Sequence, residues 1–96
     1  MTQRIPKTEI NKNNIVSQII KDYSLTLRAL NDNKEGLIAK QVADITGREV
    51  RYEGNRLYKF FRAGLLQREG NRYILTKENK EELKDTFGPN AFPFLE

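Results

Sequence analysis

The chain has 96 residues, of which 38% are apolar and 31% are charged, and its formal net charge is +4. This length suits one domain that buries roughly 60–70% of its unfolded surface, and it is too short to hold two separate cores. Cysteine and histidine are both absent, which excludes disulfides, thiolate metal sites and the most common general base, and no apolar run approaches the ~18 residues of a membrane span.

The positive charge is concentrated in two parts of the chain. Residues 48–72 hold seven cations against three acids, and residues 1–12 hold three cations against one acid. Such clustering is typical of a face that binds a polyanion. Because no apolar block follows the first basic residues, we expect no signal peptide. We also expect no membrane contact and a cytoplasmic, nucleoid-associated location.

The first 36 residues predict an arm, a helix and a turn. Residues 1–13 lack an apolar period and are predicted to form a loose basic arm, in which Arg4 and Lys7 are either disordered or follow a minor groove or phosphate backbone. From Asn14, apolar residues recur at three- and four-residue steps, which predicts an amphipathic helix of about 17 residues. Asn13 or Asn14 is expected to cap it, and the turn-forming residues 31–36 end it.

A short helix is predicted next. Residues 37–38 form either a short strand or an extended lead-in. Residues 40–46 then predict a helix that ends at Gly47, with Val42, Ala43 and Ile45 turned toward the core.

A further helix is predicted to begin between Val50 and Glu53 and to end at Ala63, followed by Gly64. At 100° per residue its apolar side chains (Leu57, Phe60 and Phe61) lie on one face. The opposite face carries Arg51, Tyr52, Asn55, Lys59 and Arg62, with Arg56 at its margin. Two interpretations of Gly54 stay open: it lies beside the apolar face and lets another helix approach, or it lies in the turn and Asn55 caps a shorter helix.

The last third of the chain predicts a hairpin, a helix and a strap. Two apolar runs, 65–66 and 73–75, flank a turn with Gly70 at its first central position, as a type II′ turn requires. Thr76 is expected to cap a helix over 77–87, which Gly88 and Pro89 terminate. The domain is thus predicted over 14–87, and residues 88–96 form an apolar strap.

This order of elements resembles a winged helix-turn-helix domain: mostly α with a small β-hairpin. Three motifs carry the resemblance over residues 36–76: "QVADITG" with Ala43 four residues before Gly47, "LYKFFRAGLL", and the hairpin "QREGNRYILT". In size and terminal helices the chain is similar to PadR-like regulators and to small DNA-binding proteins of archaeal plasmids and viruses, including a plasmid-segregation adaptor. The turn "GREVRYEG" is longer than in the tightest such units, and Glu49 and Glu53 would repel phosphate if they faced DNA.

The resemblance implies a sequence-selective protein that binds double-stranded DNA, with a recognition helix at 51–63 in the major groove and a wing at 65–76 on the backbone. Transcriptional regulation is the leading expectation. Two alternatives are a segregation adaptor that spreads from a centromere-like site and recruits a partner protein, and a winged-helix module that binds only proteins. The expected DNA-binding residues are Arg48, Arg51, Tyr52, Asn55, Arg56, Lys59, Arg62, Arg68, Asn71 and Arg72.

A homodimer is expected, because one recognition helix covers only a few base pairs. The candidate dimer residues lie in the terminal helices and the strap: Ile15, Ile19, Leu83, Phe87, Phe92, Phe94 and Leu95. The other possibility is that the strap folds back on its own helix. No residue spacing suggests a catalytic dyad, a nucleotide loop or a metal site, so we expect no enzymatic activity, no cofactor and no metal.

Overall fold

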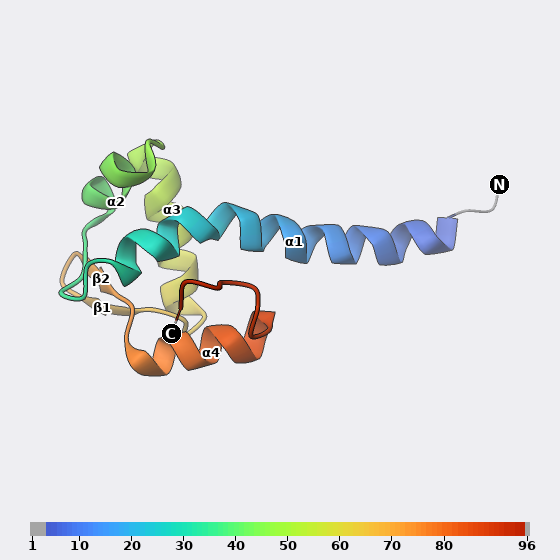
Figure 1. Ribbon diagram of the computed structural model, residues 1–96. Coiled ribbons are helices and arrows are strands. Elements are labelled where there is room, and N and C mark those ends of the chain that lie inside the picture. Colours follow the sequence, from blue (N-terminus) through green and yellow to red (C-terminus); the bar gives the residue numbers. More distant parts are fainter. Residues whose placement is uncertain (1–3, 96) are drawn as a thin grey trace.

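The structure is a computed structural model that describes residues 4–95, with the side chains of its first helix described from Ile15 onward. Over these residues the chain is mostly helical. The helices are α1 (Arg4–Asn31), α2 (Ala39–Thr46), α3 (Val50–Arg62) and α4 (Lys77–Phe87), and strands β1 (Gln67–Glu69) and β2 (Arg72–Ile74) form an antiparallel hairpin between α3 and α4. Figure 1 shows α1 running out of the folded body to the N-terminus, while the other elements surround its C-terminal half.

Helix α1 begins earlier than the sequence predicts. It starts at Arg4, so most of the expected loose arm is helical, and Asn13 and Asn14 lie inside the helix instead of capping it. Pro6 falls in the first turn, where a backbone N–H has no partner within the helix, so proline is tolerated there. Residues 1–3 of the predicted arm, and the side chains of Arg4 and Lys7, lie outside the described residues. None of the described helices is long and apolar enough to cross a membrane.

The core joins α1, α3 and α4 through large apolar side chains. Leu27, Leu57 and Leu83 are fully buried, one from each helix. The ring of Tyr23 stacks on that of Phe60 with centroids 3.9 Å apart. Burial of each such side chain contributes roughly 1.5–3 kcal/mol relative to its exposure.

The strap folds back over its own chain, which settles one of the two possibilities that the sequence leaves open. Phe92 and Leu95 are buried in the core, and the amide of Asn31 at the end of α1 donates a hydrogen bond to the carbonyl of Phe94 over 3.3 Å. Figure 1 shows the strap returning between α4 and α1. Leu83, Phe92 and Leu95 therefore fill the protomer's own core, and we withdraw them as candidates for the dimer contact.

Ile19, Phe87 and Phe94 pack partly against the same core, whereas Ile15 is exposed on α1 where the helix leaves the body. Residue 96, the last of the predicted strap, is outside the described range.

The hairpin is anchored to the body at its base. Glu69 pairs with Arg72, and Gly70 between them has a φ of 62°, as the predicted type II′ turn requires. Leu37 forms an isolated bridge with Tyr73, with N–H···O distances of 3.0 and 2.8 Å in the two directions. The preceding Gly36 has a φ of 95°, and a Cβ there would lie 2.7 Å from Cγ1 of Ile74. The extended lead-in is thus confirmed at Leu37.

Candidate nucleic-acid interface

The turn between α2 and α3 is short, and backbone geometry sets it. Gly47 ends α2 in the left-handed region with a φ of 78°, and its N–H donates to the carbonyl of Ala43 over 2.8 Å. Gly54 lies inside α3, where a Cβ would be 3.8 Å from Cβ of Ala39 in α2, an ordinary van der Waals distance. Gly54 is therefore helical, as the first interpretation predicts, but the spacing to α2 would also accept a Cβ at this position. Ile45 is exposed, so the prediction that it points to the core is wrong.

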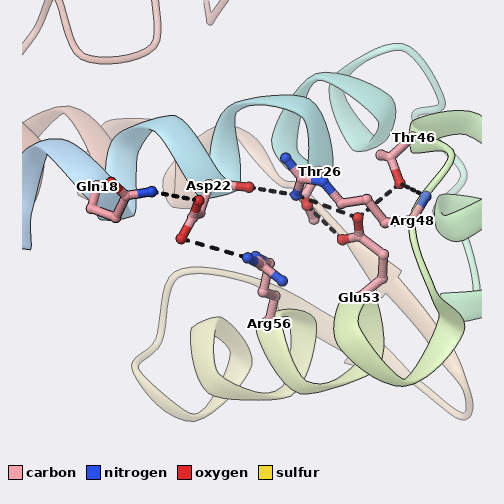
Figure 2. Close-up of polar contacts among 7 residues, drawn as sticks. All are labelled: Gln18, Asp22, Thr26, Thr46, Arg48, Glu53 and Arg56. Carbon is pink, nitrogen blue, oxygen red and sulfur yellow. Dashed lines mark hydrogen bonds and ion pairs between the residues drawn. The ribbon is translucent and has the colours of Figure 1, made fainter.

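A buried carboxylate connects the three helices around this turn. The side chain of Glu53 in α3 is fully buried. Its Oε1 accepts a hydrogen bond of 2.6 Å from Thr26 in α1, and its Oε2 accepts one of 2.8 Å from Thr46 at the end of α2. Figure 2 shows the carboxylate between these two hydroxyls and the guanidinium of Arg48. Because a buried charge is tolerated only when it is paired and hydrogen-bonded, these contacts explain how an acid can occupy the core.

Arg48 and Arg56 are expected to bind DNA, but in the structure both belong to this interior network. We therefore withdraw them as DNA-binding candidates. Arg48, whose side chain is 23% exposed, donates from Nη1 to the backbone carbonyl of Asp22 over 2.6 Å and lies 3.5 Å from Oε2 of Glu53. Arg56, whose side chain is 11% exposed, pairs with the carboxylate of Asp22 over 3.5 Å. Both would have to break these contacts with α1 in order to reach a duplex (Figure 2).

The outer face of α3 keeps the remaining polar residues. Arg51, Asn55, Lys59 and Arg62 are exposed and fall within about 80° of one another around the helix axis. Glu53, the acid inside α3, points to the opposite side and is buried. The outer face of α3 therefore presents cations and an amide without an acidic side chain. Glu49, which precedes the helix, remains exposed.

Two tyrosines flank this outer face. Tyr52 is exposed, and its ring lies 4.1 Å from the guanidinium carbon of Arg56. Tyr58 is also exposed, and its hydroxyl lies 3.5 Å from Nη1 of Arg62. Each tyrosine thus places an aromatic ring beside an arginine on α3.

The hairpin brings its own cations next to α3. The guanidinium carbon of Arg68 lies 5.2 Å from the ring centroid of Tyr73 in β2 and 5.9 Å from that of Phe61 in α3. Its Nε donates to the carbonyl of Gly70 over 2.9 Å. Arg72 donates to the carbonyl of Glu35 over 3.4 Å and stays exposed, as does Asn71 at the turn. The hairpin cation Arg68 therefore lies beside the C-terminal half of α3.

A groove of about 630 Å³ lies on the other flank of α3, between this helix, α1 and α4. We call it the α1–α3–α4 groove. Its walls are mostly apolar and aromatic, and Lys59 and Asn55 lie at its rim on the α3 side. Arg56 also lines it, and the Nε of this arginine is buried without a hydrogen-bond partner. The residues that define the groove best are Ile19, Tyr23, Tyr52, Phe60, Thr86 and Phe87.

Burial also changes the chemistry of Tyr23, which lies at the base of this groove. Burial raises the pKa of its hydroxyl above the ordinary value of 10.0, and the nearby positive charge of Arg56 opposes that rise. The neutral tyrosine is thus the form that the fold favours.

Sequence reasoning missed the residues that hold α3 in place. Thr26, Thr46 and Asp22 carry the polar contacts. A signal was present, because Thr26 lies within the apolar stripe of α1 and Glu53 within that of α3 at 100° per residue. A polar residue inside an apolar stripe indicates a buried partner elsewhere in the chain.

Comparisons with known proteins gave no match: no family model, no curated protein and no solved structure is significantly similar to the chain. Among the side chains that the structure describes, no group of three or more metal-binding residues lies close enough together to hold a metal ion. A function for the chain is therefore inferred from its charge and geometry alone.

Proposed function

We propose that the chain binds double-stranded DNA as a winged helix-turn-helix domain and selects its sequence through α3. The order of α2, a short turn, α3 and the hairpin supports this arrangement. In it the outer face of α3 enters the major groove, and the hairpin tip follows the sugar-phosphate backbone. Control of transcription is the role that such binding favours.

The burial of Glu53 is the observation that carries the proposal. An exposed carboxylate in the first turn of α3 would repel phosphate and cancel one of the cations around it. Because Thr26, Thr46 and Arg48 hold this carboxylate in the core, the outer face of α3 is left with three cations and one amide. The burial of Glu53 thus answers the objection to DNA binding for this acid, whereas Glu49 remains exposed before α3.

The exposed side chains of α3 are suited to base recognition. Arginine can donate two hydrogen bonds to O6 and N7 of guanine, and asparagine can bind N6 and N7 of adenine in the same two-point manner. We assign these roles to Arg51 and Asn55, which lie in the N-terminal half of α3. Lys59 and Arg62 follow one and two turns later and are assigned to phosphates, which usually take half or more of the contacts.

The hairpin cations are assigned to the backbone. Arg68 lies beside the C-terminal half of α3, within 5.9 Å of the Phe61 ring, so a duplex that contacts this end of the helix also lies close to the hairpin. Arg72 and Asn71 are exposed at the same turn. The two arginines add charge and Asn71 adds a neutral hydrogen-bond donor without reading bases, so together they raise affinity for all sequences equally.

Selection of duplexes from a random pool, followed by titration of the selected duplex at several salt concentrations, tests the proposal. The logarithm of affinity should fall with the logarithm of salt concentration by about 0.9 per neutralised phosphate. Asn55→Ala should relax sequence choice, whereas Arg68→Ala should weaken every sequence and lower the slope by about 1. Lys77→Ala, which removes an exposed cation from α4, is the matched control and should change neither quantity. Failure to bind any duplex, or a slope near zero, would remove the basis of the proposal.

A further inference from the structure

The apolar stripe of α1 is used over only part of its length. Seven apolar residues form the stripe and fall within an arc of about 140° around the helix axis: Ile15, Val16, Ile19, Ile20, Tyr23, Leu27 and Leu30. The last three are buried in the core of the chain, whereas Ile15 is 58% exposed and Val16 is 43% exposed. Figure 1 shows that α1 projects from the body, and the exposed Ile15 and Val16 carry the stripe onto the start of this projecting part.

A projecting helix of this kind needs a partner. Residues 4–18 would form a helix about 22 Å long at 1.5 Å per residue. Isolated helices of this length are marginal in water, because most helical stability comes from packing of an amphipathic face. Ile15–Gln18, the described side chains of this segment, are all exposed. A stable projecting helix is therefore expected to pack against something other than its own body.

The α1–α3–α4 groove lies directly beside the exposed end of the stripe. Ile19 belongs to both features, since it is part of the stripe and lines the groove. Ile15 is one turn before Ile19 on the same side of α1, so the apolar surface runs from the projecting helix into the groove. Tyr52 of α3 and Thr86 of α4 form the facing walls, and both are exposed.

We propose that a second copy of this chain covers this surface, with the projecting half of its α1 lying along the groove of the first copy and the reverse contact made at the same time. The chain itself carries both complementary parts, the exposed apolar end of the α1 stripe at Ile15 and Val16 and an apolar groove next to it. A two-fold axis would use both parts twice in one closed contact, as isologous dimers do.

This inference places the dimer contact outside the strap, and it does not depend on DNA binding. Leu83, Phe92 and Leu95 are buried within one copy and take no part. The contact instead joins Ile15 and Ile19 of one copy to the groove walls of the other.

Sedimentation equilibrium in the absence of DNA, over a range of protein concentrations, tests the contact with three variants. Ile15→Glu places a charge on the exposed stripe, and Thr86→Arg places a bulky cation on the α4 wall of the groove. Each should raise the dimer dissociation constant at least about tenfold, because each change occurs twice in a symmetric contact. Leu25→Glu is the matched control: Leu25 is a 48% exposed apolar residue on the other side of α1, and its replacement should leave the dissociation constant unchanged.

The outcomes separate this inference from the proposed function. A protein that stays monomeric at all concentrations overturns it, as does a dimer that all three variants leave intact. Weakening by Ile15→Glu without weakening by Thr86→Arg overturns the placement of the partner helix in the groove. Ile15 and Thr86 are exposed in one copy, so circular dichroism should confirm that the fold of the body is retained. Binding of a single half-site by a monomeric variant would leave the proposed DNA binding standing.

Discussion

Replacement of Glu53 by alanine should strongly destabilise the fold. The carboxylate is fully buried and accepts hydrogen bonds from Thr26 and Thr46, with Arg48 at 3.5 Å. Removal of one partner from a buried ion pair leaves the other charge uncompensated and costs about 3–5 kcal/mol. Since a domain has only about 5–15 kcal/mol of total stability, Glu53→Ala should lose a large part of it.

Urea unfolding followed by circular dichroism measures this loss. For a chain of this length, 1 kcal/mol corresponds to about 4–8 °C in Tm, so a decrease of roughly 12 °C or more should accompany Glu53→Ala. Glu49→Ala is the control, because Glu49 is an exposed acid only four residues away and makes no side-chain cap to α3. Its replacement should change the free energy of unfolding by no more than about 0.5 kcal/mol.

A double-mutant cycle with Thr26→Val separates the hydrogen bond from simple loss of packing. In the wild-type background, Thr26→Val should cost about 1.5–3 kcal/mol, the range for hydrogen bonds to charged groups. In the Glu53→Ala background the same change should cost much less, since the hydroxyl then has no carboxylate to donate to. Equal costs in both backgrounds, or a loss below about 1 kcal/mol for Glu53→Ala alone, would refute the view that this carboxylate ties α3 to α1.

Three further predictions concern the rest of the fold. Burial raises the pKa of Tyr23, so its contribution to stability should be complete below about pH 10 and should fall as the pH rises from there toward the folded-state pKa. Tyr23→Phe should remove this fall from a curve of unfolding free energy against pH, while the pH dependence due to the lysines remains. Phe92→Ala should cost about 3–5 kcal/mol in urea unfolding, because the strap inserts this ring into the core; if the strap were dispensable, the loss would be close to zero. Thr76→Ala should cost about 1 kcal/mol, because its hydroxyl accepts a 3.1 Å hydrogen bond from the N–H of Asn79 at the start of α4, and Thr76→Ser should restore most of that amount in thermal unfolding.

Elements with strong local signals could be predicted from the sequence. Gly70 in the hairpin turn, Thr76 as the cap of α4 and Gly88 at its end are all confirmed. Each depends on the chemistry of three or four neighbouring residues, such as a positive φ that glycine tolerates or a hydroxyl that accepts from an N–H. The apolar face of α3 is likewise confirmed by the burial of Leu57 and Phe60.

Features that depend on distant partners could not be predicted in the same way. The contact between Thr26 and Glu53 spans 27 residues, so no local pattern indicates which side chains meet. The inward turn of Arg56 depends in the same way on Asp22 of α1, and from α3 alone this arginine lies at the margin of an exposed face. The start of α1 was missed for another reason: Pro6 and the asparagines of residues 11–14 disfavour a helix, although proline costs little in a first turn.

One uninterrupted helix carries both the buried and the exposed parts of the α1 stripe. The angle between these two parts around the helix axis is therefore fixed. Insertion of a single residue between Gln18 and Tyr23 would rotate everything before it by about 100° and turn Ile15 away from the groove. Insertion of seven residues would lengthen the projection by about 10.5 Å while rotating it by only about 20°. Changes of length in this segment are therefore tolerated in steps of whole heptads, and the reach of the helix can vary while its direction cannot.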